Sequence, residues 1–338
     1  MPQVSVLLPF FNAAPTLNIA VESIVHQTFG DWELLLIDNG STDDGPLLAE
    51  KWTELDGRIR LTSCSERGIA HALNHGLNFI ESPYIARMDA DDWSHSSRLE
   101  KQIDYLDQHP EIGVVSCQTT FQSTSPKSEG YEHFLHWQNS IITPEEHTIH
   151  RFKESPVAHP TVMFRRALID QLGSYSTEPI PEDYELWMRW MEAGVQFAKI
   201  PEELLTWYDD VSRLSRTHPN YSEEAFFKVK GQYLARWMER HVGPDGYREA
   251  KKVVASGTSK ECRQRAHWLM EQGVQIDYLT DIVQKSPKGF EFLPYQEIGS
   301  PEEYFVLNLI GKRGVNEEVE NYFNRTGFLL GESFLSLS

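Results

Sequence analysis

The run Tyr84-Ile85-Ala86-Arg87-Met88-Asp89-Ala90-Asp91-Asp92 says most about the fold. Tyr84 to Met88 has the pattern of a short buried strand that passes directly into three carboxylates. Because side chains alternate along a strand, Asp89 and Asp91 point to the same side. Such a pair can bind Mg²⁺ or Mn²⁺, which fill their remaining positions with water and phosphate oxygens. The same acidic residues could instead cap the helix that follows.

The sequence around this run alternates strands with amphipathic helices. Val4 to Leu8 and Trp32 to Ile37 are nearly continuous apolar runs, as expected for strands covered on both faces. Further strands are predicted at Gly113–Cys117 and Gln196–Lys199, and helices at Leu17–Val25, Ile69–Ile80, Leu99–Leu106 and Tyr184–Met191. This order predicts an open α/β sheet with parallel βαβ units, whose ligands bind at the carboxyl ends of the strands. Pro9, Asp38 and Asp89 would lie on that edge.

The remaining sequence suggests two domains. From Phe121 to Val157 the pattern is lost, which is typical of a functional, disordered or locally helical segment. A helix spanning Phe226–Trp237 is followed by Gly243-Pro244-Asp245-Gly246, which predicts a boundary between residues 1–242 and 247–338. The second part has its own α/β pattern, with strands at Lys252–Ala255, Gln275–Leu279 and Tyr304–Ile310 and helices around Cys262–Met270 and Val319–Phe323. It lacks GxGxxG, which favours packing or partner binding over cofactor binding.

Composition narrows the class of protein. The 338 residues carry a formal net charge of −19, which disfavours binding to nucleic acid through a basic face. Three scattered cysteines argue for a reducing compartment. We find no signal-peptide pattern at the N-terminus and no apolar run approaching the ~18 residues of a membrane span. We therefore expect a cytoplasmic protein with at most peripheral membrane association, and we leave a homo-oligomer open.

Two further acidic motifs allow two interpretations each. Asp38-Asn39-Gly40-Ser41-Thr42-Asp43 ends the second strand, where Asp38 could accept a hydrogen bond from a nucleotide base or the loop could cap a helix. Glu182 and Asp183 begin the helix of Trp187, where they could favour the helix dipole or Asp183 could act as a general base. Spacing alone does not decide between these interpretations.

Six motifs together resemble the family 2 glycosyltransferases over about residues 1 to 240. They are Leu8-Pro9-Phe10-Phe11-Asn12, the Ile37–Asp43 run, Gly68 with Ala72-Leu73-Asn74-His75-Gly76, Met88-Asp89-Ala90-Asp91-Asp92, His159-Pro160-Thr161, and Glu182-Asp183-Tyr184-Glu185-Leu186-Trp187. The resemblance implies a GT-A fold, an open and mostly parallel sheet flanked by helices, with a smaller C-terminal α/β domain of Rossmann-like type. It also implies an inverting transfer of a sugar from a nucleotide-diphosphate donor, with UDP favoured.

The same resemblance implies roles for individual residues. Asp183 would be the general base, with Glu182 beside it. Asp91 would coordinate Mn²⁺ or Mg²⁺, with Asp89 and His218 as further contacts. The nucleotide-sugar side would comprise Pro9, Phe11, Asn12, Asp38, Gly68, Asn74, Asp89 and Arg216. The acceptor side would comprise His159, Gly173 and Trp187, although Trp187 also belongs to the apolar stripe of its helix. The acceptor would be a glycan or glycolipid of a cell-surface polysaccharide or lipopolysaccharide.

Two other classes of protein share some of these features. A nucleotidyltransferase also uses paired carboxylates beneath an α/β sheet, but it would be expected to carry a basic, glycine-rich loop near the N-terminus. A non-catalytic module that binds nucleotide sugars would keep the fold, and the carboxylates at Asp89, Asp91 and Asp183 argue against it.

Overall fold

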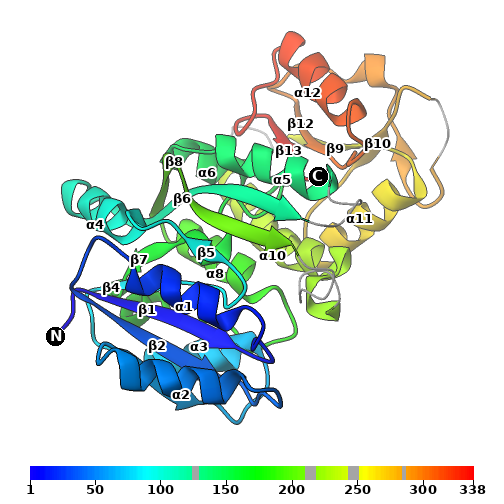
Figure 1. The fold of residues 1–338 in the computed structure, drawn as a ribbon. Helices are drawn as coiled ribbons and strands as arrows, with labels where there is room; N and C mark the ends of the chain where they lie inside the picture. Colours follow the sequence, from blue (N-terminus) through cyan, green and yellow to red (C-terminus); the bar gives the residue numbers. More distant parts are fainter. Residues whose placement is uncertain (124–128, 210–217, 243–250, 284–286) are drawn as a thin grey trace. The chain divides into compact units, whose positions relative to one another are not determined.

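The computed structural model describes residues 1–123, 129–209, 218–242, 251–283 and 287–338 (Figure 1). The chain folds into two compact units. The first comprises Met1–His147, Pro156–Glu178 and Glu185–His218, and the second comprises Thr148–Ser155, Pro179–Tyr184 and Pro219–Ser338. The predicted boundary between 242 and 247 falls beside residues 243–250, which lie outside the described residues, and it stays a prediction.

The first unit is built on an eight-stranded sheet with the order β3-β2-β1-β4-β7-β6-β8-β5. Its strands are β1 (Val4–Phe10), β2 (Trp32–Asp38), β3 (Ile59–Ser63), β4 (Tyr84–Arg87), β5 (Trp93–Ser94), β6 (Ile112–Ser123), β7 (Met163–Arg165) and β8 (Gln196–Asp209). β7 runs antiparallel to β4 and β6, and β5 runs antiparallel to β8, whereas the other pairs are parallel. The carboxyl ends of β1, β2, β4, β6 and β8 therefore share one edge, as expected for an open α/β sheet.

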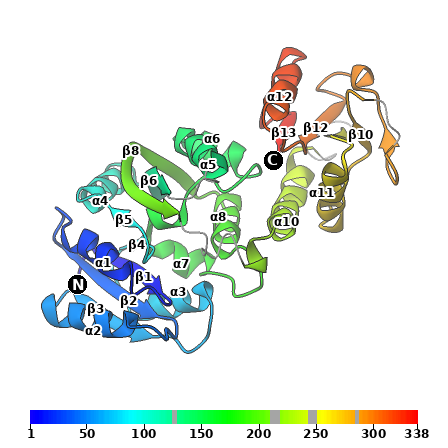
Figure 2. The same ribbon diagram turned by 45° about the vertical axis from the view of Figure 1, so that its right-hand side comes forward.

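Helices cover both faces of this sheet (Figure 1 and Figure 2). The helices are α1 (Leu17–Val25), α2 (Gly45–Leu55), α3 (Ile69–Leu77), α4 (Arg98–Gln108), α5 (Glu129–Ser140), α6 (Pro144–His150), α7 (Ala167–Leu172) and α8 (Glu182–Glu192). Val6 and Leu8 of β1 join one core cluster with residues of α1 and α4, while Leu7 joins another with residues of α3 and α8. The period of two along a strand thus sends successive side chains into two cores.

The second unit, drawn from yellow-green to red in Figure 1 from α10 onwards, carries an all-parallel sheet. Its order is β11-β10-β9-β12-β13, formed by β9 (Lys252–Ser256), β10 (Tyr278–Thr280), β11 (Glu291–Phe292), β12 (Tyr304–Asn308) and β13 (Phe334–Ser336). Its helices are α10 (Glu223–His241), α11 (Lys260–Glu271) and α12 (Val315–Arg325). The side-chain oxygen of Ser222 caps α10 by accepting from the backbone N–H of Ala225.

The mixed α/β fold with a smaller second sheet confirms the expected fold class. In the segment from Phe121 to Val157, where periodicity was lost, the described residues include α5 and α6, so this part of the chain is locally helical. β3, β5, β7, β11 and β13 were not predicted, and β10 begins at Tyr278 instead of Gln275. Strands of two or three residues show no period, and β3 has only one buried residue, Ile59, at the edge of the sheet. Among the described residues, no helix combines the length and apolarity of a membrane span.

A buried lysine makes the stability of the first unit depend on pH. The Nζ of Lys199 in β8 donates to the carbonyl oxygens of Gln138 and of Pro156, the latter at 3.1 Å. Burial lowers the pKa of Lys199 to about 7, against the opposing influence of Cys117 and Glu146. Between pH 7 and the ordinary pKa of 10.5, the unfolded chain therefore binds more protons than the folded chain at this position.

We predict that the free energy of unfolding of the wild type rises with pH relative to that of Lys199→Met. The rise is at most about 1.4 kcal/mol per pH unit between pH 7 and 10.5. Urea unfolding at several pH values in this window measures the difference between the two proteins. Lys51→Met, at an exposed position of α2, serves as the control. A difference that does not change with pH would contradict the prediction.

Candidate active site

The loops that follow β1 and β2 are fixed to each other by side-chain hydrogen bonds. Asn12 has a φ of 51°, and its Oδ1 accepts from the backbone N–H of Thr42 at 2.8 Å. Asp38, paired with Phe10 in the sheet, accepts from the backbone N–H of Ser41 at 2.9 Å. Pro9, which precedes Phe10 in the chain, is buried within β1. The structure thus brings Pro9, Asn12 and Asp38 together at the carboxyl edge of the sheet.

Asn39 extends this arrangement to the loop before α3. Its Oδ1 accepts from the backbone N–H of Gly68 at 2.8 Å, and its Nδ2 donates to the carbonyl of Glu66 at 2.7 Å. The φ of Gly68 is 122°, which residues with a side chain rarely adopt. Asn39 was not among the predicted site residues, although it lies between Asp38 and Gly40 in the quoted motif.

An aromatic ring and a cation lie side by side at the same loops. The Arg67 guanidinium is 4.3 Å from the ring centre of Phe11, a distance at which a cation is attracted to the face of a ring. Phe11 is 48% exposed despite its apolar ring. Arg67 also lies beside Gly40, since a Cβ added at that glycine would be 3.4 Å from the Arg67 Nε, so the three loops form one surface.

The acidic run forms a compact cluster. One ligand atom each of Asp89, Asp91 and Asp92 lies within 4.8 Å of the others. Asp92 is buried, and its Oδ1 accepts from the backbone N–H of Tyr208 in β8 at 3.2 Å. Asp92 was expected neither as a ligand nor as a link to β8, a contact that sequence order cannot show.

This cluster suits a divalent cation. Carboxylates so close repel one another by roughly 3 kcal/mol per pair at an effective dielectric constant of about 20. A hard cation relieves that repulsion, and carboxylate oxygens are the ligands that Mg²⁺ and Mn²⁺ prefer. The donor set of the cluster therefore fits the metal that the sequence resemblance implies.

Two buried arginines lie directly behind the cluster. Arg87 ends β4 and forms an ion pair with Asp89 through Nη1. Arg98 begins α4 and donates from Nη2 to the carbonyl of Arg87 at 2.6 Å. Their exposed fractions are 2% and 0%, so their charges act in a region from which water is largely excluded. Neither was identified from the sequence, because arginine is common on exposed surfaces and no pattern marks a buried one.

His159 and Tyr175 form a buried pair near these arginines. The Nε2 of His159 lies 2.9 Å from the hydroxyl of Tyr175, and its ring packs edge-on against Trp187 with the centroids 5.8 Å apart. Burial, followed by the positive charge of Arg87, holds the pKa of His159 well below its usual range. His159 is therefore neutral near pH 7 and acts here as a hydrogen-bonding and packing residue.

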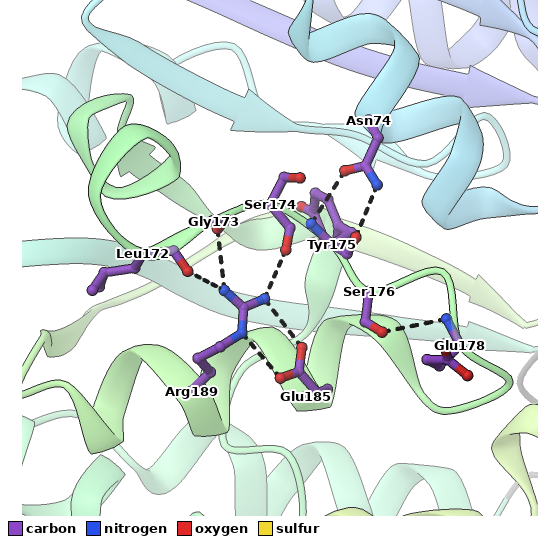
Figure 3. A network of polar contacts seen from close by, with 9 residues as sticks. All are labelled: Asn74, Leu172, Gly173, Ser174, Tyr175, Ser176, Glu178, Glu185 and Arg189. Atoms are coloured by element: carbon purple, nitrogen blue, oxygen red, sulfur yellow. Dashed lines mark hydrogen bonds and ion pairs between the residues drawn. The ribbon is translucent and has the colours of Figure 1, made fainter.

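The loop that carries Gly173 is held from two sides (Figure 3). Arg189 of α8 donates to three successive carbonyls, those of Leu172, Gly173 at 3.3 Å and Ser174 at 2.7 Å. Glu185 accepts two bonds from the same guanidinium, at 3.0 and 3.1 Å. In Figure 3 the hydroxyl of Ser174 lies on the side of the loop opposite Arg189.

Asn74 of α3 holds the next residue of this loop. Its Nδ2 donates to the carbonyl of Tyr175 at 2.8 Å, and its Oδ1 accepts from the backbone N–H of Tyr175 at 3.1 Å (Figure 3). Both polar atoms of the amide are thus engaged with backbone. The contact of Asn74 with the donor, which the sequence resemblance implied, stays a prediction.

Glu182 and Asp183 form the first turn of α8 and belong to the second unit. The Oδ1 of Asp183 accepts from the backbone N–H of Tyr184 at 2.7 Å. Glu182 is buried and accepts from the hydroxyl of Tyr221 at 2.7 Å. His218 is exposed, and Arg216 lies outside the described residues, so its predicted contact with the diphosphate stays a prediction.

Comparisons with known proteins agree with this geometry. Residues 5–173 match the family model described as glycosyl transferase family 2. The O-antigen biosynthesis glycosyltransferase WbnJ of Escherichia coli is 31% identical over 247 residues, which cover 72% of this chain and 91% of WbnJ. The UDP-Gal:alpha-D-GlcNAc-diphosphoundecaprenol beta-1,3-galactosyltransferase of Escherichia coli is 26% identical over 207 residues, 60% of this chain and 73% of the relative.

A solved structure shares the fold. Residues 1–349 of TarS from S. aureus, in complex with UDP-GlcNAc, superpose with a TM-score of 0.55 at 17% identity, covering 71% of this chain and 72% of that one. The architecture is therefore that of the GT-A glycosyltransferases. The chain belongs to glycosyl transferase family 2 and is a glycosyltransferase.

We predict that Arg189→Lys loosens the Gly173 loop. Lysine retains the charge but lacks the planar fork that meets three carbonyls and Glu185 together. Loss of these partly buried hydrogen bonds should lower the free energy of unfolding by about 1 to 3 kcal/mol. Amide hydrogen exchange at Ser174 to Ser176 should also become faster. Arg60→Lys, at an exposed ion pair with Glu33, should change neither measurement, and unchanged exchange in Arg189→Lys would contradict the role of the fork.

Proposed function

We propose that this glycosyltransferase moves a sugar from a UDP-sugar donor to a hydroxyl group of a glycan or lipid-linked glycan, in the synthesis of a cell-surface polysaccharide. The observation that carries the proposal is the carboxylate cluster on the same sheet edge as the loops of Asp38 and Gly68. The names of two relatives support the donor and the destination, since one uses UDP-Gal and the other acts in O-antigen biosynthesis. Membership of family 2 argues against the nucleotidyltransferase alternative.

On the donor side, the nucleoside would lie over the loops that follow β1 and β2. The exposed ring of Phe11 offers a flat apolar surface for a base, and Arg67 above it supplies positive charge. The Oδ1 of Asp38 accepts from the backbone of Ser41, and its Oδ2 would accept a hydrogen bond from an N–H of the base. Pro9, Asn12 and Gly68 shape the backbone around it. Asn74 and Arg216 complete the proposed donor side.

The diphosphate would lie against Asp89, Asp91 and Asp92. These residues would hold Mn²⁺ or Mg²⁺, with Asp91 the proposed direct ligand, and His218 is a further proposed contact. When bound, the metal offsets the negative charge that builds on the leaving diphosphate. The buried arginine behind Asp89 adds positive charge to the same region.

On the acceptor side, Asp183 is the proposed general base. It would take the proton of the acceptor hydroxyl as that oxygen attacks the anomeric carbon from the face opposite the diphosphate, which inverts the configuration. Glu182 would contribute negative charge from the neighbouring position. The Gly173 loop, with His159 and Trp187 behind it, would form a rigid wall for the acceptor, because Arg189 and Asn74 fix its backbone.

For the C-terminal domain, proposed as residues 247–338, we propose a role in packing or in binding a partner. Its all-parallel sheet has the connectivity of nucleotide-binding domains, but the carboxylate of Asp281, directly after β10, bonds to the turn that follows β9. Both the backbone N–H and the hydroxyl of Thr258 donate to Asp281, at 2.9 and 2.7 Å. A carboxylate at this turn disfavours the phosphate of a dinucleotide.

We predict that binding of UDP depends on Mn²⁺ and on Asp91. Calorimetry with wild-type protein should show UDP binding that Mn²⁺ strengthens at least about tenfold, a difference of about 1.4 kcal/mol. In Asp91→Ala most of this gain should be lost, because a proposed ligand is removed. Asp170→Ala, which removes a carboxylate from α7, should behave as the wild type. Equal UDP affinity with and without Mn²⁺ in the wild type would contradict the proposed metal site.

We also predict that Asp183→Asn separates catalysis from binding. A screen of nucleotide sugars for slow hydrolysis with Mn²⁺ first identifies the donor, and a synthetic GlcNAc-diphospholipid then serves as acceptor. Asp183→Asn should retain affinity for UDP and Mn²⁺, since a base acts on the acceptor proton in the transition state. Transfer should fall by about two to four orders of magnitude. A variant that transfers at the wild-type rate would move the base elsewhere, with Glu182 the next residue to test.

A further inference from the structure

Arg87 occupies an unusual position for an arginine. It is the last residue of the buried strand β4 and is 2% exposed, yet it lies two residues before the first carboxylate of the cluster. Its Nη1 donates to the Oδ1 of Asp89. Its Nε is buried and, within the described part of the chain, has no hydrogen-bond partner. A burial this costly, with one donor unused, indicates that the position serves the neighbouring carboxylates.

The charge of Arg87 is stable in this place. An arginine guanidinium stays protonated in proteins, and the ion pair with Asp89 favours its charged form further. The guanidinium therefore acts directly on Asp89, whose ligand atom lies within 4.8 Å of those of Asp91 and Asp92.

A fixed positive charge behind the cluster has opposite effects on the two ligands of the proposed site. It repels a divalent cation, so it weakens the capture of Mn²⁺ when no nucleotide is present. It attracts a diphosphate, so it strengthens the binding of UDP once Mn²⁺ is in place. The interaction is not screened as it would be in water, because the side chain is buried.

We propose that Arg87 is a positioning residue that orients Asp89 and couples the binding of the metal to the binding of the diphosphate. This inference rests on the proposed function. Arg87 is not required to touch either ligand, because the orientation of Asp89 and the balance of charge transmit its effect. A residue with only a structural role would change both affinities in the same direction.

Three variants of Arg87 test this inference. Arg87→Gln removes the charge and keeps an amide that can donate to Asp89, Arg87→Met removes both, and Arg87→Lys keeps the charge. Arg58→Met is the matched control, since it removes an arginine from an Arg–Asp pair with Asp56 away from the cluster. Calorimetry measures the affinity for Mn²⁺ alone and then the affinity for UDP at saturating Mn²⁺. Thermal unfolding confirms that each variant is folded.

For Arg87→Gln we expect Mn²⁺ alone to bind about tenfold more tightly, and UDP with saturating Mn²⁺ to bind about tenfold more weakly, each change corresponding to about 1.4 kcal/mol. Arg87→Lys should remain within about threefold of the wild type in both measurements, and Arg58→Met should not differ from it. If Arg87→Met folds, its affinities for Mn²⁺ and for UDP should change in the same directions as those of Arg87→Gln.

The inference is overturned if Arg87→Gln weakens both ligands together or changes neither. It is also overturned if Arg87→Lys behaves as Arg87→Gln does, because charge would then not be the cause. A wild-type protein whose affinity for UDP is the same with and without Mn²⁺ would instead overturn the metal site of the proposed function, and the inference with it. The wild-type measurement thus separates the two failures.

Discussion

The parallel pairing of β1 with β2 and β4 is the interaction on which the rest of the first unit depends. Its register sets Phe10 opposite Asp38 and Leu7 opposite Arg87, so the three strands point to one edge, where β1 and β2 end together and β4 ends opposite Leu7. All seven residues of β1 are buried, because helices cover both faces of the sheet. Burial on both faces favours apolar residues along the strands, so most charged side chains lie where the strands stop. The loops and carboxylates of the site gather at that edge as a direct consequence.

Polar side chains that bond to backbone then give the edge its shape. Asn39 ties the loop after β2 to Gly68, Asn74 ties α3 to Tyr175, and Arg189 gathers three carbonyls of the Gly173 loop. Loops at a site have few apolar contacts of their own, so such bonds replace packing as the source of rigidity. Each of these residues comes from a helix or a strand end, which places the anchors on the rigid part of the fold.

Much of the fold could be predicted from sequence, and less of the site. The nearly continuous apolar run of Val4–Leu8 and the helical period in Ile69–Ile80 reflect burial, which leaves a pattern along the chain. The contact of Asp92 with Tyr208 follows instead from how strands are ordered in the sheet, and the ion pair of Arg87 with Asp89 depends on the burial of an arginine, which no local pattern marks. The two-residue strand β5, which pairs with β8, is too short to show any period. The carboxylate cluster could be predicted from where a buried strand ends in the sequence. The residues around the cluster could be predicted only with knowledge of the order of the strands in the sheet.

The sign of the local charge, and not that of the whole chain, decides whether a diphosphate can bind. A net charge of −19 repels an anionic donor at long range, but salt screens that repulsion beyond about 8 Å at physiological ionic strength. Within that distance the donor would meet Arg67 at the loop edge and Arg87 behind Asp89. Arg67 is accessible and can contact a ligand directly, whereas Arg87 is buried and acts through the carboxylates. An acidic protein can thus recognise an acidic substrate when a few cations lie close to the place where that substrate binds.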